Sequence, residues 1–191
     1  MEFDGYSTTL SVMDAYDDHQ LMYDCKAPVS VEYFSMCNRL VSRNVFERNV
    51  ILPFEGVNMW DDVGLCTRVR FYTRGTAVIN KGFYHYNRQN EQSTTRRPLL
   101  ERAREQELCI SCIEDFFRKE DSHDKYRLFL SYLRLVAAED LFYYEPDIWR
   151  QKFEGLKDDL WKLRKLYTTK QLFKFYTLGC GGFIGKLVWK R

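Results

Sequence analysis

The sequence has no long hydrophobic run and little of what breaks or cross-links a chain. No stretch of 18 consecutive apolar residues occurs among the 191, so no membrane-spanning helix is expected. The first 25 residues lack a basic stretch followed by an apolar one, so no signal peptide is expected. The chain has four prolines, no repeat and no low-complexity segment, which excludes solenoid and disordered classes. We therefore expect a folded cytoplasmic protein.

Cysteine is present, but not in a pattern that predicts cross-links or a metal site. The six cysteines are scattered through a chain large enough to fold without disulfides, so we expect them to be reduced. Cys109 and Cys112 form a Cys-x-x-Cys pair, and the helical periodicity places both thiols on one apolar face with Ile113 and Phe116. No second ligand pair follows, so core packing is favoured over redox or zinc chemistry.

Neither sign of charge dominates the composition. The 29 Lys and Arg residues nearly balance 27 Asp and Glu residues, and the net charge of +2 gives no bias towards nucleic acid. The distribution is uneven, because residues 1–25 carry six acids and no Lys or Arg. Residues 155–191 carry nine bases and two acids, a balance of 9 − 2 = +7. We expect the two ends of the chain to face different surroundings.

The spacing of apolar residues changes part-way along the chain. Before about residue 95, β-prone pieces alternate with turns and short helices, and residues 30–49 suggest a short helix, a strand and a second short helix. The segment 59–75 begins with acids and ends at a glycine, which predicts a helix. From residue 98 onward the period is 3.6, which predicts a series of long helices. Their expected ranges are 98–120, 123–145 and 146–167, followed by a shorter helix broken by glycines.

The segments with the most functional information lie between residues 33 and 96. They read Cys37-Asn38-Arg39-Leu40, then "FEGVNMWDD" over Phe54–Asp62, then "FYHYNR" over Phe83–Arg88 with Ser93 behind it. In this order, at gaps of about 20 residues, they resemble the second half of bacterial glycosyltransferase family 2 catalytic domains. The resemblance covers residues 30–95 and is closest to enzymes of capsule and surface-polysaccharide clusters.

The resemblance implies an α/β fold. Residues 1–95 would be the acceptor-side half of a GT-A-type nucleotide-sugar transferase domain, and residues 96–191 a C-terminal helical region. The implied reaction is inverting transfer of a sugar from a nucleotide diphosphate sugar to a hydroxyl of a glycan or lipid-linked acceptor. The family also implies a divalent metal, Mg²⁺ or Mn²⁺, held by an Asp-x-Asp motif, which these 191 residues do not contain. The chain thus looks like a domain without most of its N-terminal βαβ half, and its activity alone stays open.

Asp61 and Asp62 are the predicted catalytic residues. An acceptor hydroxyl is a poor nucleophile at neutral pH, and a carboxylate within hydrogen-bond reach can take its proton. A helix N-terminus keeps such a carboxylate ionised. The resemblance assigns the base to Asp62, while Asp61 stands where the family has glutamate. The alternative is that both acids only complement the helix dipole.

Five further residues are candidates for substrate binding. Trp60 could stack on a sugar or belong to the core, and Asn38 could hold the acceptor-side loops together. By the resemblance, His85 is a candidate contact to the diphosphate or to the metal, although a histidine on a strand is also a common core residue. Arg88 and Arg96 could neutralise a leaving diphosphate, because guanidinium forks match phosphate oxygens, or could be solvated loop charges.

The basic C-terminal region interleaves its charges with aromatic residues. Trp161, Phe173, Phe175 and Trp189 lie among the nine bases at helical spacing. This composition is typical of a helix that lies on an anionic membrane surface, here the inner face of the plasma membrane. A solvated helix packed on the rest of the protein is the alternative. No nucleic-acid-binding motif accompanies the bases, so nucleic acid is not an expected partner.

A second, non-catalytic function also stays open at the level of the sequence. The chain could be a truncated remnant that acts as an interaction module, with its acids serving only as helix caps. The missing Asp-x-Asp motif favours this interpretation. The intact segments Gly56–Asp62 and Tyr84–Asn87 favour an enzyme.

Overall fold

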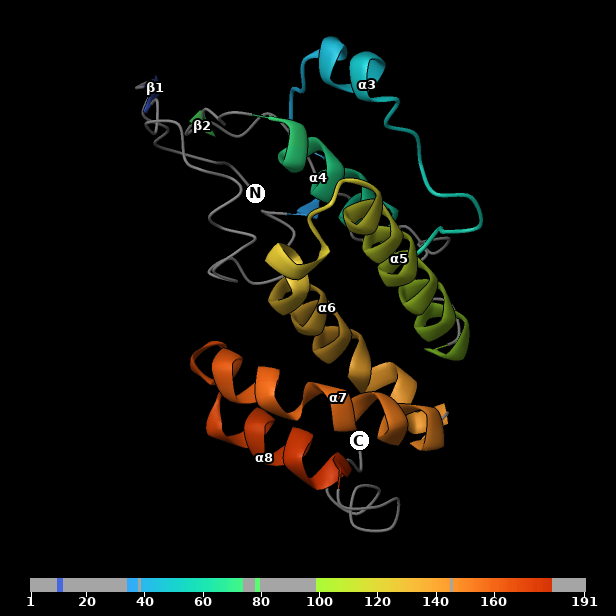
Figure 1. Cartoon of the computed structure of the whole chain (residues 1–191), viewed down its shortest axis with the longest axis vertical. Helices are drawn as coiled ribbons and strands as arrows, with labels where there is room; N and C mark the ends of the chain where they lie inside the picture. Colours follow the sequence, from blue (N-terminus) through green and yellow to red (C-terminus); the bar gives the residue numbers. More distant parts are fainter. Residues whose placement is uncertain are drawn as a thin grey trace, which may run out of the picture.

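The computed structural model describes residues 10–11, 34–37, 39–73, 78–79, 99–144 and 146–179, and these residues are mainly helical (Figure 1). Two short antiparallel strands, β1 (Leu10–Ser11) and β2 (Val78–Ile79), pair Leu10 with Ile79 and Ser11 with Val78. The helices are α3 (Arg43–Asn49), α4 (Asp61–Tyr72), α5 (Leu99–Lys119), α6 (His123–Tyr144), α7 (Pro146–Leu163), the 3-10 helix η2 (Arg164–Leu166) and α8 (Thr169–Gly179).

The predicted α/β fold with a GT-A-type domain is wrong. Within the described ranges the only sheet is the β1–β2 pair, so no parallel sheet flanked by helices is formed there. Residues 50–52 are β-prone but form no strand: Val50 ends α3 with a left-handed φ of 50°, and of the three only Ile51 is buried. Strand propensity describes a fit to a neighbouring strand, and within the described ranges no strand pairs with this segment. The predicted boundary at residue 95 lies outside the described residues.

Antiparallel helices α5 and α6 provide most of the core. Their turn is closed by Ser122, whose backbone N–H donates to the Phe117 carbonyl at 2.8 Å, while Asp121 adopts a positive φ of 51°. The Phe117 and Tyr126 rings stack at 4.5 Å between centroids. Fully buried side chains of both helices surround them, among them Ile110, Ile113, Phe129, Leu130 and Leu133. The predicted helices 98–120 and 123–145 are confirmed, since each observed helix ends within one residue of these bounds.

Helices α7 and α8 lie side by side at the end of the molecule opposite α3 (Figure 1). Leu156, Leu160 and Leu163 form the buried stripe of α7. In α8, Phe175 is buried and its ring meets Tyr167 edge-on at 5.1 Å between centroids. Over the described ranges, no helix combines the length and the apolar character needed to cross a bilayer.

Candidate functional site at the start of helix α4

The predicted catalytic acids occupy the first turn of α4, where an irregular loop ends. In this loop Gly56 has a φ of +76°, and the Val57 N–H donates to the Phe54 carbonyl at 3.3 Å. Trp60, the residue before the helix, also has a positive φ, of 69°, which is uncommon for a bulky side chain. Its carbonyl accepts the first helical hydrogen bond, from the Gly64 N–H at 3.0 Å. The loop therefore sets the direction in which α4 begins.

Helix α5 fixes this loop through Glu105. One carboxylate oxygen of Glu105 accepts hydrogen bonds from the backbone N–H groups of Asn58 and Met59, at 3.1 and 2.5 Å. One turn further along α5, the Cys109 thiol donates to the Trp60 carbonyl at 3.2 Å. Sequence reasoning missed Glu105, and its only signal is that it lies one turn from Cys109 on a predicted helix. The contact joins residues 46 positions apart in the chain.

The two acids at the start of α4 have different surroundings. Asp61 is exposed, whereas Asp62 is half-buried and faces the segment that contains Ser35 and Met36. The Asp62 carboxylate accepts hydrogen bonds from the Ser35 hydroxyl and the Met36 N–H. Burial nevertheless raises the pKa of Asp62, and the charge of Asp61 acts in the same direction, against those two hydrogen bonds and the charge of Arg39. A raised pKa makes the ionised Asp62 a stronger base.

One stripe of α4 faces the segment 34–39. Asp62, Cys66 and Arg70 follow one another at a spacing of four residues, which places them on one side of the helix. The Cys66 sulfur lies 3.4 Å from the sulfur of Met36. Burial raises the pKa of Cys66 to about 11, so its thiol is unreactive at neutral pH. Asp62 is thus the half-buried end of a stripe whose other two members, Cys66 and Arg70, are buried.

Arg39 supplies the positive charge at this site. Its Nε donates to the Ser35 carbonyl at 2.7 Å, so Arg39 is tied to the same short segment that binds Asp62. The side chain is half-buried. The site therefore combines one carboxylate on α4 with one hydroxyl and one guanidinium that lie four residues apart on the facing segment.

The Cys-x-x-Cys pair belongs to the packing of α4 on α5. Cys109 is fully buried, and burial raises its pKa to about 12. Cys112 is half-buried, and burial raises its pKa as well. The predicted core position is confirmed for Cys109. A thiol held in its protonated form is a poor nucleophile and a poor redox group.

The opposite face of α4 contains a buried arginine. The Arg68 guanidinium lies 3.8 Å from the centre of the Phe54 ring, and its Nε donates to the Gly64 carbonyl at 3.1 Å. A Cβ on Gly64 would lie 2.9 Å from the Phe54 ring, so Gly64 leaves the room that Phe54 fills. Arg68 is 7% exposed, and burial lowers its pKa. Its Nη2 has no hydrogen-bond partner in the part of the chain that the structure describes.

The other predicted site residues are not brought to this place by the structure. Trp60 is half-buried and packs against the hydrophobic core, which agrees with the core alternative for its side chain. Asn38, His85, Arg88 and Arg96 lie outside the described residues. Among the residues that are described, no group of three His, Cys, Asp or Glu side chains is arranged to hold a metal ion. The predicted metal contact of His85 stays a prediction.

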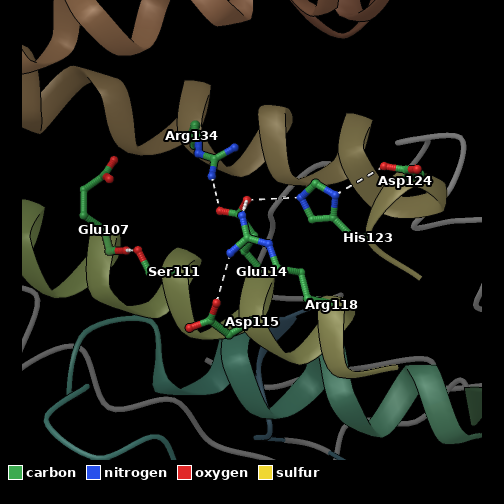
Figure 2. A network of polar contacts seen from close by, with 8 residues as sticks. All are labelled: Glu107, Ser111, Glu114, Asp115, Arg118, His123, Asp124 and Arg134. Atoms are coloured by element: carbon green, nitrogen blue, oxygen red, sulfur yellow. Dashed lines mark hydrogen bonds and ion pairs between the residues drawn. The ribbon is translucent and has the colours of Figure 1, made fainter. Parts of the chain in front are cut away.

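A second polar cluster, centred on Glu114, joins α5 to α6 (Figure 2). One oxygen of Glu114 accepts from Arg118 Nη2 at 2.6 Å and lies 3.1 Å from His123 Nε2, and the other oxygen accepts from Arg134 Nη2. Burial raises the pKa of Glu114, but Arg134, His123 and Arg118 together outweigh it and hold the pKa below its usual value. Both oxygens are occupied by donors, so this cluster fixes the pairing of two helices. Sequence reasoning missed it.

Comparison with protein-family models, with curated proteins and with solved structures finds no match to this chain. The resemblance to glycosyltransferase family 2 stays a prediction from its motifs. The chemistry that the described geometry allows is proton transfer to Asp62 from a hydroxyl group that approaches the start of α4.

Proposed function

We propose that the chain acts in glycosyl transfer, as the acceptor-side part of an inverting sugar transferase in which Asp62 takes the proton of the acceptor hydroxyl. The observation that carries the proposal is the half-buried Asp62 on the first turn of α4, directly behind the "EGVNMW" loop. The motif order between Phe54 and Asp62 supplies the reaction class. The proposal does not include a GT-A fold, which the helical structure contradicts.

In the proposed step the acceptor oxygen forms a bond to the anomeric carbon of the donor sugar. The bond from that carbon to the diphosphate oxygen breaks, its electron pair leaves with the diphosphate, and the configuration at the carbon inverts. The hydroxyl proton moves to a carboxylate oxygen of Asp62 and later to water. The Ser35 hydroxyl and the Met36 N–H hold the carboxylate in one orientation. The described residues do not fit a Mg²⁺ or Mn²⁺ site, so no step goes through a metal ion.

The transfer experiment compares Asp62→Asn with Asp61→Asn. Release of nucleoside diphosphate is measured from nucleotide sugars with Mg²⁺ or Mn²⁺ and glycan acceptors. It is measured for the 191-residue chain and for the chain extended by any in-frame coding sequence before Met1. Asp62→Asn should lower turnover at least about a hundredfold, in line with the loss of a general base, while Asp61→Asn should stay within about threefold.

Two outcomes contradict the proposal. Turnover of a folded Asp62→Asn chain close to that of the wild type removes Asp62 from the mechanism. Failure of every nucleotide sugar to release its diphosphate in both forms of the chain refutes glycosyl transfer as a whole.

A second candidate function, a helical interaction module without catalysis, is favoured by one specific observation. Asp62 already accepts hydrogen bonds from Ser35 and Met36, so the carboxylate can serve as a clamp between α4 and the segment before α3. A clamp predicts that Asp62→Ala loses stability, by about 1 kcal/mol or more, as for the loss of a helix cap. If Asp62 is instead a general base, Asp62→Asn should lose turnover while its unfolding midpoint stays close to that of the wild type. Thermal unfolding beside the transfer assay separates the two.

A further inference from the structure

Four large apolar side chains are exposed along α7, η2 and α8. Their exposed fractions are 60% for Trp161, 38% for Leu166, 60% for Phe173 and 41% for Tyr176. The opposite sides of the same helices are packed, since Leu160 on α7 and Phe175 on α8 are buried. Packing within the described part of the protein therefore does not explain these four side chains, and exposed apolar surface of this kind marks interaction sites.

Positive charge accompanies these side chains. Six bases lie between residues 157 and 176, namely Lys157, Lys162, Arg164, Lys165, Lys170 and Lys174. The acids in the same range are Asp158 and Asp159, and Asp159 is only 1% exposed. It accepts a hydrogen bond from Ser131 at 2.7 Å and pairs with Arg127 at 3.0 Å. Two of the six bases pair with acids, Lys157 with Glu154 at 2.8 Å and Lys162 with Asp159 at 3.5 Å. From Leu160 to Gly179 the sequence contains no acid, so the charged residues of η2 and α8 are all basic.

Trp161 and Arg164 show how the two kinds of side chain are combined. The Arg164 guanidinium lies 4.4 Å from the Trp161 ring, and its Nη1 donates to the Trp161 carbonyl at 2.7 Å. An exposed indole covered by a guanidinium suits the boundary between lipid headgroups and acyl chains, where one side of the pair is apolar and the other is charged. Helices α7 and α8 lie at the end of the molecule away from α3 and α4 (Figure 1).

We infer that α7, η2 and α8 form a peripheral binding surface for an anionic lipid bilayer. The bases attract the headgroup charges, at about fivefold in partition for each base that reaches the surface, and the exposed aromatic side chains enter the interfacial region. An anionic bilayer fits better than an apolar protein groove, because bases are interleaved with the apolar side chains along the whole segment. The inference is independent of the proposed glycosyl transfer.

Vesicle sedimentation tests the surface with the full chain. The wild type should sediment with vesicles of phosphatidylcholine and phosphatidylserine at low salt, and less at high salt, because screening weakens attraction between exposed charges. Vesicles of phosphatidylcholine alone should bind it at least about tenfold less. The double variant Lys165→Glu, Lys170→Glu should lower binding to the mixed vesicles by about tenfold or more. Phe173→Ala should lower it by a smaller factor of about three to five.

The matched control is the double variant Lys119→Glu, Lys125→Glu. It changes the net charge by the same amount at two exposed positions, the last residue of α5 and the first turn of α6, and its binding should stay within about twofold of the wild type. Circular dichroism confirms that each variant is folded. Equal binding to neutral and anionic vesicles, or an equal loss in the control, overturns the inference. Binding to soluble polyglutamate without binding to anionic vesicles overturns it in favour of an acidic protein partner.

Discussion

Two partly buried carboxylates at different places in this protein have pKa values that are shifted in opposite directions. Glu114, between α5 and α6, is surrounded by donors from three side chains, and its pKa lies below the usual value. Asp62, at the start of α4, has two hydrogen bonds and a neighbouring acid, and its pKa lies above the usual value. Burial raises the pKa in both cases, so the difference comes from the charges that surround each group.

The comparison separates a stabilising carboxylate from a reactive one. A group whose pKa is lowered by folding stabilises the folded state when it is ionised. A group whose pKa is raised by folding is ionised at a cost in stability, and that cost is typical of residues that exchange protons in a function. We therefore expect substitutions near Glu114 to change stability and substitutions at Asp62 to change chemistry.

The largest expected effect comes from breaking the core that brings Glu114 to Arg134. Phe117 is fully buried and its ring stacks on Tyr126, so Phe117→Ala should lower the free energy of unfolding by about 3–5 kcal/mol in urea denaturation. Phe173→Ala is the matched control. Because Phe173 is 60% exposed, this variant should change the free energy of unfolding by no more than about 0.5 kcal/mol. Similar losses in both variants would mean that α5 and α6 do not form the core.

A smaller effect is expected from the polar cluster itself. Glu114→Gln removes the charge that Arg118 and Arg134 face, and should lower the free energy of unfolding by about 1–3 kcal/mol. Glu47→Gln is its control, because Glu47 pairs with Arg43 on the exposed helix α3 and should cost less than about 0.5 kcal/mol. If Glu114→Gln is as mild as Glu47→Gln, the cluster does not stabilise the helix pair.

The stability of the protein should depend on pH through Glu114. Its pKa is lowered in the folded state, so its contribution is fully present above the unfolded value of about 4.5 and is lost as the pH falls through the folded value. As the pH falls below 4.5, the midpoint temperature of thermal unfolding should therefore decrease more steeply for the wild type than for Glu114→Gln. Parallel curves for the two proteins would contradict the lowered pKa.

The smallest effect is expected on the other face of α4, at Arg68. Its guanidinium is buried on Phe54 with one nitrogen unpaired, so Arg68→Met keeps the packing and removes a buried charge. Its free energy of unfolding should equal that of the wild type or exceed it by about 1 kcal/mol. A loss above about 2 kcal/mol in urea denaturation would show that Arg68 stabilises the fold.

The helices with a regular apolar period could be predicted from the sequence. The predicted helices beginning at 98 and 123 are confirmed, because a repeating apolar face is a local property of the chain. The helix predicted over 59–75 is confirmed as α4 (Asp61–Tyr72), and its signal was the pair of acids in the first turn. The α/β class expected for residues 1–95 was wrong, because whether β-prone residues form a strand depends on partners elsewhere in the chain.

The surroundings of the site could not be predicted in the same way. The contact of Glu105 with the loop before α4 and the contact of Glu114 with Arg134 join residues 46 and 20 positions apart. Such pairs depend on how the helices pack, which a residue pattern does not contain. The helix start at Asp61 was predictable, whereas the approach of Ser35, Met36 and Arg39 to Asp62 was not.

The most direct test of the central claim is a titration of Asp62 and Glu114 in the folded chain by carboxyl-carbon NMR. The account predicts that Asp62 titrates above the ordinary aspartate value of 3.8 and that Glu114 titrates below the ordinary glutamate value of 4.5. Asp61→Asn should lower the pKa of Asp62, because it removes a neighbouring negative charge. An Asp62 pKa at or below 3.8 in the wild type would contradict its assignment as the base.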